Sequence, residues 1–180
     1  MRHKLRLLLT SRDVMTNKTY NVLFLCTHNS ARSVLAEGLL NQLGAGRFKA
    51  YSAGSSPSGS VNPLALKILQ SLGCDTAGIR SKGWDEFADP DAPRMDFIFT
   101  VCDNAAGEVC PIWPGHPMTA HWGFADPSLV KGDDDTRLAA FAHTAQLITA
   151  RLHLFTSLPM ETLDHMSLSA ELRKLGGQTA

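Results

Sequence analysis

The sequence predicts a single α/β domain in which helices cover both faces of a parallel sheet. From Tyr20 onward, short β-rich runs alternate with longer stretches of helical periodicity, the order typical of a parallel sheet between two helical layers. The chain has 180 residues, of which 44% are hydrophobic, enough for one core and too few for two. We therefore expect one three-layer α/β/α domain with a central, mainly parallel four-stranded sheet.

The first half of the domain contains two predicted pairs of strand and helix. Residues 21–25 and 48–52 are short runs rich in apolar and aromatic side chains, as expected for buried strands. Residues 33–43 and 64–72 repeat apolar side chains at helical spacing, and a glycine follows each run directly. Glycine after the last periodic residue commonly ends a helix.

The second half contains two further strands and two helices by the same criteria. Residues 95–101 and 119–122 are predicted strands, and residues 134–155 and 160–175 are predicted helices. The end of the third strand delivers Cys102 to the carboxyl edge of the sheet, where open α/β sheets bind their ligands.

Composition excludes several classes of partner. Seventeen Lys and Arg residues balance 17 Asp and Glu residues, so we expect no nucleic acid and no membrane surface as partner. Every apolar run is far shorter than the roughly 20 residues needed to cross a bilayer. We expect a cytoplasmic protein, and four cysteines in such a chain favour catalysis, redox exchange or metal binding over structural disulfides.

An anion-binding loop is predicted between the first strand and the first helix. Residues 26–33 read Cys-Thr-His-Asn-Ser-Ala-Arg-Ser, and five residues separate Cys26 from Arg32. A loop of this length at a helix N-terminus can direct backbone N–H groups inward and stabilise a thiolate. The guanidinium of Arg32 can then grip two oxygens of a tetrahedral oxyanion. The alternative is a buried cysteine beside an ordinary solvated arginine.

The segment VLFLCTHNSARSVLAEGLL resembles the signature loop of the low-molecular-weight tyrosine phosphatases and of the arsenate reductases that share their fold. The resemblance implies the low-molecular-weight phosphatase fold, with Cys26 as nucleophile and Arg32 as oxyanion clamp. It also implies that the hydroxyl of Ser33 helps to hold the thiolate and that Asn29 keeps the loop in shape. The residues implied to bind arsenate, phosphate or sulfate are Thr27, His28, Asn29, Ser30, Ala31, Arg32 and Ser33. No acid or base role is assigned to His28.

A general acid is predicted in the segment HWGFADP, residues 121–127. Displacing an oxygen from arsenate or phosphate requires a proton for the leaving group. The segment resembles the acid motif of the family, which implies Asp126 as the acid. Asp126 could instead begin a turn or cap the next helix, and Trp122 could shield the site or belong to the core.

Two cysteines distinguish a reductase from a phosphatase. Cys102 and Cys110 lie eight positions apart in a segment rich in small residues, which can move. The run TVCDNAAGEVCPIWPG resembles the redox loop of arsenate reductases. This implies reduction of arsenate through an adduct on Cys26, followed by a disulfide relay from Cys26 to Cys102 to Cys110. An external thiol reductant, of thioredoxin or glutathione and glutaredoxin type, would regenerate the enzyme, and no tightly bound cofactor is expected.

Several alternatives stay open. The same loop would serve a phosphatase that hydrolyses phosphate monoesters, or a non-enzymatic module that binds oxyanions or senses thiols. A metal site built from Cys102, Cys110, His116 and His121 lacks the paired spacing typical of structural zinc, so no metal is expected. We expect Cys74 to be structural.

Glu37 has three interpretations. It would support the anion loop, or with Asn29 and Ser52 it would hold the monovalent cation found in some relatives, or it would lie on a solvated helix surface.

The domain organisation follows from the extent of these motifs. We expect a flexible N-terminal extension at residues 1–18, a phosphatase-like arsenate reductase domain at residues 19–158, and a helical C-terminal extension at residues 159–180.

Overall fold

The computed structural model describes residues 18–44, 46–108 and 111–177. Its helices and strands alternate along most of the chain, as predicted. In order they are β1 Tyr20–Cys26, α1 Arg32–Leu43, β2 Phe48–Gly54, α2 Pro63–Ser71, α3 Asp85–Ala88, β3 Phe97–Thr100, α4 Asp103–Ala106, β4 Met118–His121, the 3-10 helix η1 Pro127–Leu129, α5 Asp134–Thr156 and α6 His165–Gly177.

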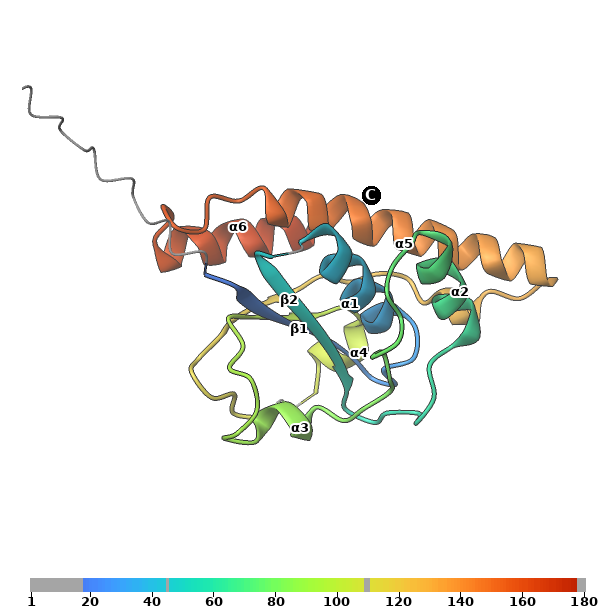
Figure 1. Cartoon of the computed structure of the whole chain (residues 1–180), viewed down its shortest axis with the longest axis horizontal. Coiled ribbons are helices and arrows are strands. Elements are labelled where there is room, and N and C mark those ends of the chain that lie inside the picture. The colour runs from blue at the N-terminus through green and yellow to red at the C-terminus, as the bar shows by residue number, and fades with distance from the viewer. Residues whose placement is uncertain (1–17, 45, 109–110, 178–180) are drawn as a thin grey trace, which may run out of the picture.

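The four strands form one parallel sheet in the order β2-β1-β3-β4, which confirms the predicted fold class. Figure 1 shows β1 and β2 side by side. The chain passes from β1 to β2 on one side and then crosses to β3 on the other side of β1. This reversal creates a switch point at the carboxyl ends of β1 and β3, the place where doubly wound sheets form their binding crevices.

Successive side chains of β1 point to opposite faces of the sheet, and each face packs against its own hydrophobic core. Val22 and Phe24 face the larger core, together with side chains of α1, α5 and α6. Leu23 and Leu25 face the smaller core, which includes Phe87 of α3. In Figure 1, α5 and α6 lie along one side of the sheet and α3 lies on the other. The sheet is therefore covered on both faces, which explains why its central strands are almost wholly apolar.

Several boundaries differ from the prediction. The last helix begins at His165 rather than at residue 160, because residues 159–163 form a turn in which Thr162 N–H donates to the Pro159 carbonyl. Asp164 then caps the helix by accepting from Ser167 N–H at 2.9 Å. The third strand covers Phe97–Thr100 and not residues 95–101. The four-residue helices α3 and α4 were not predicted, since such short helices carry little periodicity.

The last helix packs closely onto β4. The indole Nε1 of Trp122 donates to the Leu172 carbonyl at 3.0 Å, and a side chain at Gly176 would collide with the backbone of His121. Trp122 is 1% exposed and its ring stacks on Phe99 with centroids 3.8 Å apart. Of the two interpretations of Trp122, the structure supports the core residue.

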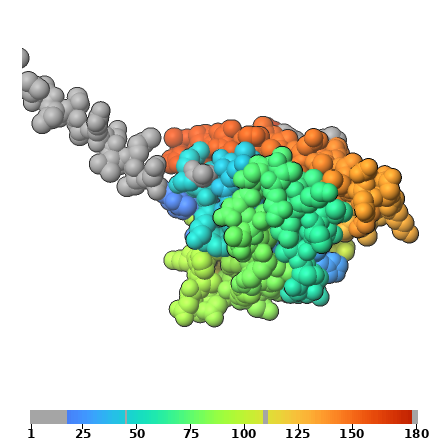
Figure 2. Space-filling model, turned by 45° about the vertical axis from the view of Figure 1, so that its right-hand side comes forward, coloured from blue at the N-terminus to red at the C-terminus, as the bar shows by residue number. Residues whose placement is uncertain are grey.

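No helix in the described part of the chain has the length and apolarity that a membrane span requires. Figure 2 shows α5 and α6, orange to red, along one edge of the molecule, with green residues of the segment around α3 at the front.

The packing of α6 predicts an asymmetric mutational response. Leu172→Ala removes a fully buried side chain and should lower the free energy of unfolding by about 2–5 kcal/mol. Met166→Ala is in the same helix, but its side chain is 80% exposed, so it should change the free energy of unfolding by less than about 0.5 kcal/mol. Urea denaturation measures both, and equal effects would show that α6 is not part of the core.

Candidate active site

The loop that follows β1 is held open by a second segment that binds its carbonyl groups. The carbonyls of Cys26, Thr27, His28 and Ser30 accept hydrogen bonds from the N–H groups of Ser55, Ser56, Ser58 and Asn62, at 2.9 to 3.3 Å. These four hydrogen bonds fix the backbone of the loop just before α1. Backbone N–H groups of such a loop at a helix N-terminus can bind an anion.

The sulfur of Cys26 lies at the centre of this loop. Cys26 is 3% exposed, and its sulfur contacts Ser33 Oγ at 2.9 Å and accepts from Asn29 N–H at 3.2 Å. Asn29 has a positive φ of 46°, a conformation that asparagine tolerates better than most residues. Gly54 closes β2 against the loop, since a Cβ there would lie 2.5 Å from the Thr27 carbonyl oxygen.

Arg32 and Asp126 meet at the mouth of the loop. Arg32 Nη2 lies 2.7 Å from Asp126 Oδ2, and Arg32 Nη1 donates to the Phe124 carbonyl at 3.0 Å. The other carboxylate oxygen, Asp126 Oδ1, accepts from Ser128 N–H at 3.0 Å and caps η1. Asp126 therefore acts as a cap and also faces the anion loop, so the two interpretations of this residue are compatible.

The described site cavity is small. It has a volume of about 30 Å³, and its lining residues are Cys26, His28, Ser30, Ala31, Arg32, Asp126 and Ser128. None of the lining residues is a tryptophan, tyrosine or phenylalanine. The His28 side chain is exposed, in agreement with the absence of an assigned role.

Cys102 reaches the same edge of the sheet from β3. Leu25 of β1 pairs with Thr100 of β3, and Val101 N–H donates to the Leu25 carbonyl. Cys102 is 2% exposed, and its sulfur lies 3.6 Å from Thr27 Oγ1. The structure thus brings Cys102 beside the residue that follows Cys26. Cys110 lies outside the described residues.

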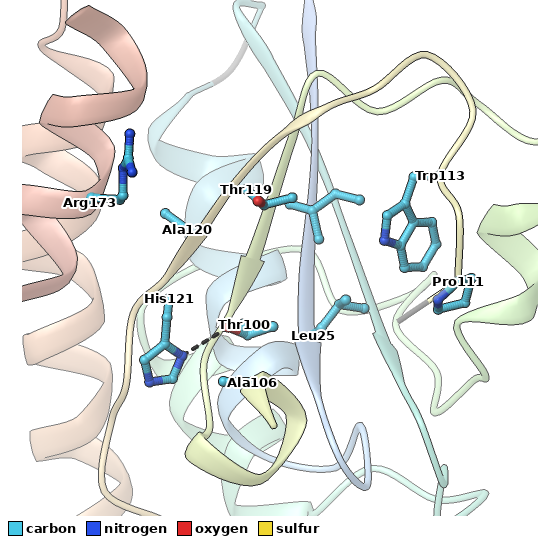
Figure 3. A pocket seen from close by; sticks show the side chains of 10 residues that line it. Leu25, Thr100, Ala106, Pro111, Trp113, Thr119, Ala120, His121 and Arg173 are labelled. Carbon is cyan, nitrogen blue, oxygen red and sulfur yellow. Dashed lines mark hydrogen bonds between the residues drawn. The ribbon is translucent and has the colours of Figure 1, made fainter. Parts of the chain in front are cut away.

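A larger cavity of about 560 Å³ lies next to α4, the short helix that begins after Cys102. Figure 3 shows its walls, with Trp113 on one side, His121 of β4 and Arg173 of α6 on the other. His121 Nδ1 lies 2.9 Å from Thr100 Oγ1. Within the described ranges, no cluster of three or more His, Cys, Asp or Glu side chains is arranged to hold a metal ion.

Glu37 lies behind the loop and not on a solvated surface, which corrects one interpretation of this residue. It is 7% exposed and accepts from the Ser52 hydroxyl. Burial raises the pKa of Glu37, while the nearby Lys82 ammonium and the Ser52 hydroxyl oppose this shift. Burial likewise lowers the pKa of Lys82, against the attraction of Glu37.

Sequence reasoning missed two parts of this site. No role was predicted for the segment after Gly54, which binds the loop carbonyls, although its repeated serines were a usable signal. The pairing of Lys82 with Glu37 gave no local signal, because the two residues are 45 positions apart in the chain.

Residues 21–167 match the sequence family described as low molecular weight phosphotyrosine protein phosphatase. The chain belongs to this family. An arsenate reductase of Bacillus subtilis strain 168 is 37% identical over 142 residues, which cover 78% of this chain and 96% of the relative.

Solved structures of family relatives have the same fold. The arsenate reductase of Archaeoglobus fulgidus DSM 4304 is 30% identical with a TM-score of 0.54, and the match covers 73% of this chain and 98% of that one. The thioredoxin-dependent arsenate reductase of Corynebacterium glutamicum is 25% identical with a TM-score of 0.57, and the match covers 82% of this chain and 65% of that one.

The hydrogen bond between Ser33 and Cys26 predicts a change in sulfur reactivity. Ser33→Ala removes a donor to the thiolate and should slow alkylation of Cys26 by iodoacetamide at pH 7 roughly tenfold. Ser58→Ala is the control, because its hydroxyl binds the Ser60 carbonyl and not the sulfur. Mass spectrometry of the alkylated peptide measures the rate, and an unchanged rate in folded Ser33→Ala would contradict the assigned contact.

Proposed function

We propose that this protein reduces arsenate to arsenite, with Cys26 as nucleophile and Cys102 and Cys110 as a thiol relay. The observation that carries this proposal is the position of Cys102, whose sulfur lies 3.6 Å from the hydroxyl of Thr27, next to Cys26. A phosphatase would resolve its cysteinyl intermediate with water and would need no second thiol there. The similarity to the curated arsenate reductases supports the same reaction.

The first step uses the anion loop. Arsenate binds to the N–H groups of residues 27–33 and to Arg32, and the Cys26 thiolate attacks arsenic to form a sulfur–arsenic bond. Asp126 donates a proton to the departing oxygen, which leaves as water. Because Arg32 and Asp126 form an ion pair at 2.7 Å, arsenate must replace Asp126 on the guanidinium, and this frees the carboxyl group to face the leaving oxygen.

The second step moves two electrons onto arsenic. The Cys102 thiolate attacks the sulfur of Cys26, a disulfide forms, and the electron pair of the sulfur–arsenic bond stays on arsenic, which leaves as arsenite. Cys110 then attacks Cys102, so that the Cys26 thiolate is released and a disulfide joins Cys102 and Cys110. The 560 Å³ cavity beside α4 offers space for this segment to rearrange.

The shape of the site favours a small inorganic anion over phosphotyrosine. Among the described residues, the lining of this cavity of about 30 Å³ includes no phenylalanine, tyrosine or tryptophan, whereas recognition of an aryl group usually relies on aromatic or apolar walls. Phosphate and sulfate share the tetrahedral shape of arsenate and should bind in the same loop.

The final reductant must be an external thiol donor of two electrons, because the relay ends with a disulfide between Cys102 and Cys110. A thioredoxin-type protein is the donor that we propose, since the relative from Corynebacterium glutamicum is thioredoxin-dependent. A glutaredoxin with glutathione is the alternative donor.

The relay predicts that the cysteines have separable roles. Cys102→Ala should abolish multiple-turnover arsenate reduction with thioredoxin and spare slow hydrolysis of aryl phosphates, while Cys26→Ser should abolish both. Cys110→Ala should accumulate a disulfide between Cys26 and Cys102, which peptide mass mapping would detect. Cys74→Ala is the matched control, because Cys74 is buried beside Gln42, away from the loop.

A full rate of arsenate turnover in Cys102→Ala would rule out the relay. Tight binding of arsenate by the wild-type protein, with no turnover by any dithiol donor, would instead favour an oxyanion-binding module.

The role of Asp126 gives a separate prediction. Asp126→Asn can still cap η1 through its side-chain oxygen but has no carboxylic proton, so the single-turnover rate of arsenate reduction should fall about a hundredfold. Arsenate affinity should not weaken, because Arg32 is no longer paired with a carboxylate. Asp133→Asn, at the cap of α5, should leave both quantities unchanged, and a normal rate in Asp126→Asn would exclude Asp126 as the acid.

A further inference from the structure

A closed ring of buried polar groups lies behind the anion loop. Lys82 N–H donates to Asn29 Oδ1 at 2.8 Å, and Asn29 Nδ2 donates to Ser52 Oγ at 2.8 Å. The Ser52 hydroxyl donates to Glu37, and Lys82 Nζ lies 3.6 Å from the same Glu37 oxygen. Lys82 therefore contacts two members of this ring, Asn29 through its backbone N–H and Glu37 through its ammonium.

The direction of every hydrogen bond in this ring is determined. A backbone N–H can only donate, so the oxygen of Asn29 must face Lys82 and its NH₂ group must face Ser52 and Ser33. Ser33 Oγ accepts from Asn29 at 3.0 Å, which leaves its own hydrogen for the sulfur of Cys26. The ring thus orients the donors that surround the nucleophile.

The ammonium of Lys82 is held as a buried cation. Its side chain is 5% exposed, that of Glu37 is 10% exposed, and Lys82 Nζ also donates to the Arg80 carbonyl at 3.2 Å. A buried carboxylate without a positive partner is strongly destabilising. The Lys82 ammonium supplies the positive charge that stabilises the ionised form of Glu37, the carboxylate that accepts from Ser52.

These residues do not fit the monovalent cation that the family resemblance implied. Asn29 Oδ1 accepts from Lys82 N–H, and Ser52 Oγ accepts from Asn29 Nδ2. One oxygen of Glu37, Oε2, is contacted by both Ser52 and Lys82. A second cation would meet the repulsion of the Lys82 ammonium at short distance in a poorly solvated place.

We propose that the Lys82 ammonium is a built-in substitute for a monovalent cation, which makes this protein independent of potassium or sodium. Lys82 is then a positioning residue that acts through Glu37, Ser52 and Asn29. The inference concerns the anion loop itself, so it holds for any reaction at Cys26 and does not rest on arsenate as the substrate.

The surroundings of Lys82 make the inference testable. Glu37 and Lys82 line a cavity of about 570 Å³ that also includes Lys49, Arg80 and Glu86. Part of this cavity wall belongs to the segment around α3, which lies at the front of Figure 2. Because Glu37 already lines this cavity, shortening Lys82 would leave space beside the carboxylate, where an ion from solution could take the place of the ammonium.

The experiment compares thermal unfolding in potassium chloride and in tetramethylammonium chloride at equal ionic strength. The wild-type Tm should be the same in both salts. Lys82→Ala should lose roughly 10 °C in tetramethylammonium chloride and recover at least half of this loss in potassium chloride. Lys82→Met removes the charge but fills the space, so it should lose stability equally in both salts.

A matched control and a second readout accompany this comparison. Lys49→Ala removes an exposed lysine from the same cavity, and its Tm should be the same in both salts. The kcat/KM for arsenate should change in the same direction as the Tm. Potassium should raise the kcat/KM of Lys82→Ala and should leave that of Lys82→Met unchanged. The stability readout stands even if arsenate is not the substrate.

Three results would overturn the inference. They are a potassium-specific rise in the wild-type Tm, no response of folded Lys82→Ala to potassium, and a Lys82→Met protein as stable as the wild type. If Lys82→Ala does not fold in either salt, the wild-type and Lys82→Met measurements decide the question.

Discussion

The parallel pairing of β1 with β3 is the constraint on which the proposed chemistry depends. Residues 22–25 pair with residues 97–100 in register, so the chain leaves both strands at the same level of the sheet. Cys26 and Cys102 therefore emerge at one edge although 75 positions separate Cys102 from Thr27. A shift of one residue in either strand would turn its side chains to the other face of the sheet and separate the two sulfur atoms.

The anion loop depends on supports that lie outside it. Its carbonyls are bound by the segment after β2, and its asparagine is bound by Ser52 and by the backbone of Lys82. Asn29 has a positive φ of 46°, so the surrounding contacts must compensate for the conformational cost. The loop is consequently organised before an anion arrives, which is the condition under which hydrogen-bond donors stabilise developing charge most strongly.

The charges of the site are arranged as two ion pairs at different depths. The pair of Arg32 and Asp126 lies at the mouth, with 15% and 20% of the side chains exposed, and the pair of Lys82 and Glu37 lies deeper, with 5% and 10% exposed. The outer pair can exchange partners with an incoming anion at modest cost. The inner pair is expensive to break and thus suits a permanent structural role.

The α/β class, the succession of strands and helices along the chain, and the loop between Cys26 and Arg32 could be predicted from the sequence, because each depends on short-range periodicity or spacing. The pairing of Arg32 with Asp126, the burial of Glu37 against Lys82 and the packing of α6 onto β4 could not. These contacts join residues 94, 45 and roughly 50 positions apart. Local propensity carries no record of such partners, since they are set by which strands become neighbours and which faces are covered.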